Sequence, residues 1–191
     1  MTRIIHAQQL KNTCQRSSSE DSKWRNEQKN VQDKAKREVK ATKAMDKGAI
    51  ETKSDFFNED GSAKNIENGY AIGVNGEKIV TCMICADKRG AQFLTPEGEY
   101  GADIHGHTPG AGQELPGPVD FPETKPKYYW APSGALRVVE IVSIDSGKNR
   151  EFSMQVRTVY GGTTKMNRAV KRWKSGMSKK AILRIEEKGG L

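Results

Sequence analysis

Four residues of ligand type stand in two close pairs near the middle of the chain. Cys82 and Cys85 form a C-x-x-C pair, His105 and His107 form an H-x-H pair, and 19 residues lie between Cys85 and His105. Zinc binds about four sulfur, nitrogen or oxygen donors in a tetrahedron, and structural sites often take them from two such pairs. The pattern therefore makes these four residues candidate ligands of a structural or catalytic zinc ion.

The two cysteines also fit an ordinary strand. The run KIVTCMIC is β-prone, and cysteine behaves as a small apolar residue in strands. The H-x-H spacing is tighter than the usual pair, which has about three to five intervening residues. A redox C-x-x-C would open a helix in a βαβ unit, which this sequence does not offer. We favour the strand interpretation and keep zinc, structural or hydrolytic, as the alternative.

Catalysis has little support from the sequence alone. Glu99, Asp103 and Glu114 lie near the histidines, and a metal-assisted nuclease could use such groups, but a Gly/Pro-rich segment fixes no geometry. The chain lacks both the G-x-x-x-x-G-K-[S/T] motif for nucleotide hydrolysis and the G-x-G-x-x-G motif for dinucleotide binding. We therefore expect a non-enzymatic protein with no cofactor other than the candidate zinc.

Charge is segregated along the chain, whose net charge is +8. Residues 1–55 carry 13 Lys/Arg and 8 Asp/Glu, residues 56–135 carry 6 and 11, and residues 136–191 carry 13 and 5. Basic ends thus flank an acidic centre. This distribution predicts an anionic partner for the ends, either nucleic acid (DNA or RNA) or an acidic protein surface.

The segment 163–191 predicts a basic helical tail. Thr163 or Thr164 can cap a helix whose apolar residues share one side, and Ser178 can cap a second helix, although AILRI could equally be a strand. The opposite side is cationic, as phosphate contact requires. The predicted nucleic-acid contacts in this tail are Lys165, Arg168, Lys171, Arg172, Lys174, Lys179 and Lys180.

A second candidate contact lies in the run FPETKPKYYWAP. Lys127 beside Tyr128 and Trp130 offers a phosphate contact next to aromatic rings on which bases stack. The alternative, which we favour slightly, is that these aromatic residues close the end of the folded domain.

Residues 1–55 form a predicted N-terminal polar arm, with one helix over residues 17–48 and a glycine stop at Gly48. Its thin apolar stripe includes Trp24, Val31 and Val39, which must pack on this protein or on a partner. An adaptor, or an inhibitor of a host enzyme, that binds another protein through this helix and the aromatic run is therefore the alternative function.

After a linker at 56–68, the segment 69–162 predicts a small antiparallel β domain. Asn75-Gly76 predicts a tight hairpin with a type I′ turn, and residues 135–145 and 150–160 predict another, the first strand central and the second nearer an edge. LRVVEIVSIDSGKNREFSMQVR resembles the paired strands of SH3-like or OB-like barrels, which carries no function with it. The fold class is α+β, with a strongly bent sheet or barrel and a long Pro/Gly-rich loop at 101–134.

Three cysteines, an odd number, make no disulfide framework, and no apolar run approaches the length of a membrane span. We expect a cytoplasmic protein without membrane contact. The sequence as a whole predicts a nucleic-acid-binding accessory protein, of phage or mobile-element type, that contacts phosphates through its basic C-terminal helix.

Overall fold

The computed structural model describes most of the 191-residue chain. The described residues are 18–65, 68–79, 83–87, 90–93, 100–117, 120, 124–144, 152–174 and 177–190. The chain divides into two compact units, residues 1–40 and residues 41–191. In the described part, no helix is long and apolar enough to cross a membrane.

The described part of the first unit is the start of helix α2, which runs Ser18–Glu51 and continues into the second unit. Its surface is charged, with side-chain pairs such as Lys34–Glu38 one turn apart. The apolar stripe stays exposed here: Trp24, Val31 and Val39 are 51%, 63% and 55% exposed.

The rest of α2 belongs to the second unit, and it does not stop at Gly48 as predicted. A Cβ at Gly48 would collide with the carbonyl oxygen of Gly76. The glycine therefore permits close approach of the helix to the turn after β1, and the helix continues to Glu51. The short helix α3, Lys53–Phe56, follows directly.

The second unit is built on an open, mixed six-stranded sheet with the order β2-β1-β5-β6-β7-β8. All neighbouring strands are antiparallel except β5 and β6, which are parallel. A separate hairpin pairs β3 with β4. The α+β class is therefore confirmed, but the sheet is neither closed into a barrel nor wholly antiparallel. The strands are β1 Gly69–Ile72, β2 Lys78–Ile79, β3 Met83–Asp87, β4 Gly90–Phe93, β5 Ala102–Gly106, β6 Lys127–Trp130, β7 Leu136–Ile144 and β8 Phe152–Tyr160.

Two of the sequence predictions about this sheet need correction. The segment 101–134 is not only a loop, because it contains the central strands β5 and β6. The hairpin at Asn75-Gly76 forms, but Gly76 alone takes a positive φ, of 87°, so the turn is not the predicted type I′. The prediction that β7 is central and β8 lies at an edge is confirmed.

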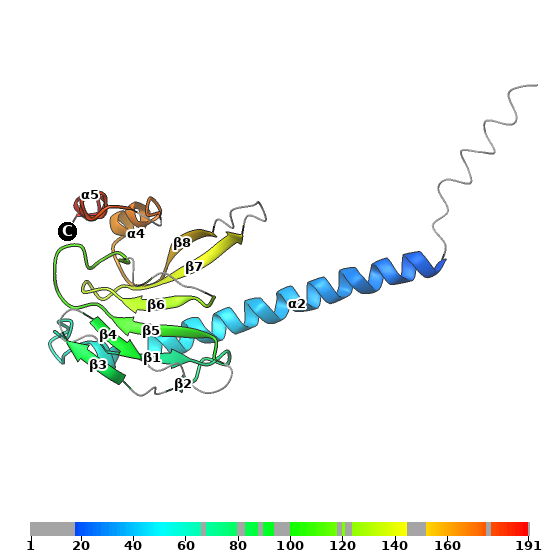
Figure 1. Ribbon diagram of the computed structural model, residues 1–191, viewed down its shortest axis with the longest axis horizontal. Helices are drawn as coiled ribbons and strands as arrows, with labels where there is room; N and C mark the ends of the chain where they lie inside the picture. Colours follow the sequence, from blue (N-terminus) through cyan, green and yellow to red (C-terminus); the bar gives the residue numbers. More distant parts are fainter. Residues whose placement is uncertain are drawn as a thin grey trace, which may run out of the picture. The chain divides into compact units, whose positions relative to one another are not determined.

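Two apolar clusters cover the two faces of the sheet, as the alternation of side chains along each strand requires. On the α2 face, Met45 and Ala49 of α2 pack with Ile104, Tyr128 and Trp130, among others. The α5 face is covered by α4, Thr164–Val170, and α5, Lys179–Gly189, which lie together over one side of the sheet (Figure 1). Its cluster includes Tyr129, Val139, Met166, Val170 and Trp173.

The predicted caps of the C-terminal helices are confirmed. The Thr163 side chain accepts a hydrogen bond from the Met166 N–H, and Ser178 accepts one from Ala181. The run AILRI is therefore helical and lies within α5, and its apolar residues Ile182 and Ile185 are buried against the sheet.

Candidate metal centre

His105 and His107 lie at the end of β5, on one side of the sheet. Residues two apart on a strand point to the same face, which brings the two imidazoles side by side over Tyr129. Gly106 between them faces the other way, where a Cβ would lie 2.6 Å from Cδ1 of Phe56. The H-x-H spacing and the small central residue together place both rings on the α5 face.

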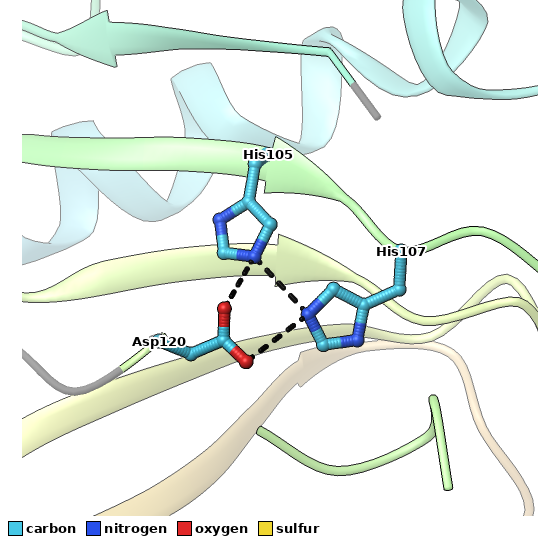
Figure 2. Close-up of side chains that lie close together, drawn as sticks. All are labelled: His105, His107 and Asp120. Atoms are coloured by element: carbon cyan, nitrogen blue, oxygen red, sulfur yellow. Dashed lines mark hydrogen bonds and ion pairs between the residues drawn. The ribbon is translucent and has the colours of Figure 1, made fainter. Parts of the chain in front are cut away.

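Asp120 completes a group of three with the two histidines. It comes from the segment that crosses from β5 to the parallel strand β6, and its carboxylate points between the two rings (Figure 2). Asp120 Oδ1 lies 2.9 Å from His105 Nε2, and Oδ2 lies 3.5 Å from His107 Nε2. The two Nε2 atoms are 3.1 Å apart.

These separations suit a small tetrahedral cation. Zinc ligands about 2.0–2.1 Å from the metal lie about 3.3 Å from one another, close to the three observed distances. The distances join four atoms, because the two histidines contact different oxygens of Asp120. One ligand atom from each of the three residues lies within 4.8 Å of the other two, close enough to share one ion. The side chains of His105, His107 and Asp120 are only 13%, 4% and 8% exposed, so the protein shields most of this group from bulk water.

The ring of His107 is held in the tautomer that a metal needs. Its Nδ1 lies 2.7 Å from the carbonyl oxygen of Gln113, and because a carbonyl only accepts, Nδ1 carries the proton. When the ring is neutral, its electron pair is then on Nε2, the nitrogen that lies 3.1 Å from His105 Nε2 and 3.5 Å from Asp120 Oδ2. Tyr129 stacks on the same ring, with centroids 4.6 Å apart and planes 18° apart. Metal-bound histidines commonly have such a backbone partner.

Asp120 is positioned by its own turn. Its Oδ2 accepts a hydrogen bond of 2.6 Å from the Gly117 N–H, and its N–H donates to the Gly117 carbonyl oxygen. Burial raises the pKa of this carboxyl, but hydrogen bonds and charge from His105, with a smaller contribution from His107, hold it well below its usual range. The carboxylate is thus ionised, as a metal ligand must be.

The loop that carries this turn, residues 107–117 with Asp120, is called the site loop below. Arg137 of β7 is fully buried beneath it and donates through Nη1 to the Glu114 carbonyl oxygen at 2.7 Å and to Glu114 Oε2 at 2.9 Å. Ser133 donates its N–H and hydroxyl to the same carboxylate. Glu186 of α5 accepts the N–H groups of Gly112 and Glu114 at 2.8 and 3.0 Å.

Of the four ligands predicted from the sequence, the structure brings His105 and His107 together. Cys82 lies outside the described residues, and Cys85 is in β3 with its side chain not described, so their metal role stays a prediction. Three acidic residues were candidates beside the histidines. Of these, Glu99 lies outside the described residues and Glu114 forms an ion pair with Arg137. Burial raises the pKa of the third, Asp103, although Lys127 offsets part of the increase.

Sequence reasoning missed Asp120. It lies 13 positions beyond His107, in a segment whose sequence has no periodic pattern from which the direction of its side chain could be predicted. The one local signal was its neighbourhood, since Gly117 three residues earlier permits the turn that presents the carboxylate.

The predicted aromatic contact is wrong for two of its three residues. Tyr128 and Trp130 are each 1% exposed and belong to the cluster on the α2 face. Tyr128 donates its hydroxyl to Asp46, and Trp130 donates its ring N–H to Thr52. Alternation along β6 turns both rings into the core, where no base can stack on them.

The predicted basic residues of the tail lie at the surface. All seven, from Lys165 to Lys180, are exposed, and within the described residues none forms an ion pair with a carboxylate. Met166, Val170 and Trp173 beneath them are buried at 3%, 1% and 4% exposure. Lys165, Arg168 and Arg172, with Thr164 and Lys188, line a groove of about 380 Å³.

Comparison with known proteins adds nothing to this geometry. No family model matches the chain, and no curated protein or solved structure resembles it significantly. The function is therefore inferred from the site itself.

Proposed function

We propose that this protein is a zinc-dependent hydrolase whose metal is held by His105, His107 and Asp120. The observation that carries the proposal is the convergence of three side chains of ligand type, with His107 and Asp120 buried and His105 partly buried, whose ligand atoms lie within 4.8 Å of one another. Each is oriented by its own hydrogen bond or stacking partner. Structural zinc sites are closed by four protein ligands, whereas catalytic sites use three and leave the fourth position to water. Three ligands found among the described residues match the catalytic arrangement.

A zinc ion held by His105, His107 and Asp120 would supply an activated water molecule for attack on a carbonyl carbon. Zinc lowers the pKa of its bound water to about 7 and polarises the carbonyl oxygen of the substrate. Enzymes with two His and one carboxylate on a single zinc cleave peptide bonds, whereas many phosphodiesterases use two metals about 3.5–4 Å apart. The described residues offer one three-ligand group, which favours an amide or peptide substrate over a phosphodiester.

The test is hydrolysis of a fluorescence-quenched peptide mixture by the full chain, with zinc and with a chelator. We expect activity that needs zinc and that falls at least about 100-fold in Asp120→Asn, which keeps the shape but removes the ligand charge. Asp60→Asn, on an exposed turn, is the matched control and should keep full activity. Zinc binding without hydrolysis of any amide would contradict the proposal, as would activity that survives in Asp120→Asn or that follows iron, which also uses this ligand set.

A second proposal is that the basic tail binds nucleic acid, DNA or RNA. The observation that favours it is the exposed row of seven cations on α4, α5 and the turn between them, with Met166, Val170 and Trp173 packed beneath. Like charges crowded together without carboxylates repel one another, and phosphates would relieve that repulsion. Lys165, Arg168 and Arg172 of this row line one groove together with Lys188.

Fluorescence anisotropy with DNA and RNA at several salt concentrations tests this second proposal. Replacing Lys165, Arg168 and Arg172 by Gln should weaken binding about 10- to 100-fold and lower the salt slope by about 0.9 per lost phosphate contact. The matched control replaces Lys34, Lys36 and Arg37 of α2 by Gln, which removes the same charge elsewhere. Equal losses in both triple variants would mean that only net charge matters and would overturn the tail as a binding site.

A further inference from the structure

The site loop is held at its centre by a carboxylate from the C-terminal helix. Glu186 Oε2 accepts the N–H of Gly112 and Oε1 accepts the N–H of Glu114, so the carboxylate brackets Gln113 from both sides. The bonded residues are 74 and 72 positions away along the chain. Gln113 is the residue whose carbonyl oxygen accepts the His107 Nδ1 proton.

Both the burial of Glu186 and its position in helix α5 disfavour the ionised form of its carboxyl group. The residue is 6% exposed and lies in the last turn of α5, the end of a helix that repels negative charge. Burial raises the pKa of Glu186, although the two backbone hydrogen bonds lower it in part. An apolar or basic side chain here would leave the N–H groups of Gly112 and Glu114 without this acceptor, so the carboxylate is what holds the centre of the site loop in place.

A series of contacts connects Glu186 to His107. Glu186 holds the backbone on both sides of Gln113, and the Gln113 carbonyl oxygen accepts the proton on His107 Nδ1. That tautomer puts the ring's electron pair on Nε2, the nitrogen that faces His105 and Asp120. Trp173 also donates its ring N–H to the Pro116 carbonyl oxygen, so the helical tail contacts the loop at a second place. Partners of this kind commonly change metal affinity when they are removed.

We infer that Glu186 is a positioning residue of the metal centre, and that the C-terminal helix α5 is therefore part of the metal site as well as part of the basic tail. This inference rests on the proposed metal site. It assigns Glu186 no contact with substrate or metal, because its effect passes through Gln113 to His107.

The chain supplies its own control for the test. Glu187, the next residue, is exposed, and substituting it changes the charge by the same amount at the same end of α5. Glu186→Gln turns one of its two acceptor oxygens into a donor that faces a backbone N–H, while Glu187→Gln leaves the site loop untouched. Zinc affinity is measured for both variants in the full chain by competition with a chromophoric chelator. The protonation of His107 is measured by nitrogen-15 NMR of the metal-free protein.

In wild type we expect His107 with the proton on Nδ1 and a measurable zinc affinity that Asp120→Asn abolishes. Glu186→Gln should weaken zinc binding about 10- to 100-fold and give a mixture of His107 tautomers, while Glu187→Gln stays within about twofold of wild type on both readouts. Glu186→Asp, which keeps two acceptors on a shorter stem, should fall between them. If Glu186→Gln does not fold, Glu186→Asp is compared with Glu187→Gln on the same two readouts.

The outcomes separate this inference from the function on which it rests. Equal zinc affinity and the same single His107 tautomer in the Glu186 and Glu187 variants would overturn the positioning role and leave the metal site intact. A wild-type chain that binds no zinc would overturn the proposed function. In that case the His107 tautomer in the metal-free variants would still show whether Glu186 orients the ring.

Discussion

The two faces of the sheet differ in the kind of side chain they bury. On the α2 face the charged group of Arg157, Asp46 and Glu140 is partly exposed, with side chains 32%, 23% and 23% accessible. On the α5 face Arg137 and Glu114 pair at 0% and 8% exposure. Six of the seven buried polar residues in the described chain belong to the site loop or bond to it, and Thr52 is the exception.

Burial of charge is unfavourable unless every group is paired, and an apolar cluster of the same volume would stabilise a fold as well or better. The α2 face follows that rule, with its ions at the rim and its interior apolar. The α5 face departs from it around one loop. This difference suggests that the polar groups there are kept for a site and that the α2 face serves mainly to hold the sheet together.

The largest expected effect comes from breaking one ion pair on each face. Arg137→Met leaves Glu114 buried without its charged partner and should lower the free energy of unfolding by about 3–5 kcal/mol. Arg157→Met leaves Asp46 and Glu140 partly hydrated and should lower it by about 1–2 kcal/mol. Urea unfolding of the metal-free protein measures both, and equal losses would remove the distinction between the faces.

Gly106 affects both faces of the sheet. Its neighbours His105 and His107 point to the metal site on the α5 face, whereas a side chain at Gly106 itself would point at Phe56 on the α2 face. Gly106→Ala places a methyl group 2.6 Å from a ring carbon and should cost about 1–3 kcal/mol of stability. The strain should also displace the two flanking histidines and weaken zinc binding. A Gly106→Ala protein with wild-type stability and zinc affinity would show that β5 has more freedom than the packing indicates.

A smaller effect is expected from pH in the metal-free protein. The pKa of Asp120 is lowered in the folded state, so its stabilising contribution is complete above its unfolded value of about 3.9 and is lost as pH falls toward the folded value. The free energy of unfolding of wild type should therefore decrease relative to Asp120→Asn as pH falls below about 4. Parallel pH curves for the two proteins would mean that Asp120 is not coupled to the histidines.

The smallest effect is expected on the first unit. Val31→Ser and Val39→Ser change side chains that are 63% and 55% exposed, and each should change stability by less than about 0.5 kcal/mol. Circular dichroism during thermal unfolding measures this. A larger loss would show that the exposed stripe of α2 is covered in solution and would give the predicted adaptor role its first support.

Much of the second unit could be predicted from local patterns. Alternation along residues 135–160 predicted the β7–β8 hairpin, and Thr163 and Ser178 predicted the helix starts, because these signals depend on neighbours in sequence. The parallel pairing of β5 with β6 could not be predicted in this way. ADIHG and KYYW are too short to show a clear period, and their pairing depends on a crossover of 20 residues.

The residues of the candidate site also divide into those that the sequence could predict and those that it could not. His105 and His107 were found because two ligand residues stand close together in sequence. Asp120, Arg137 and Glu186 were not, since each reaches the site from a different element and a carboxylate or guanidinium in isolation carries no signal. Conversely, Tyr128 and Trp130 looked like a binding surface because the sequence does not show which side of β6 faces the core.

X-ray absorption spectroscopy of the zinc-loaded full chain tests the central claim most directly. We predict one zinc per chain with two imidazole nitrogens at about 2.0–2.1 Å, carboxylate and water oxygens at about 2.0–2.2 Å, and no sulfur neighbour. In Asp120→Asn the site should lose its zinc. A sulfur ligand at about 2.3 Å would instead place Cys82 or Cys85 on the metal, and it would contradict a three-ligand centre built from His105, His107 and Asp120.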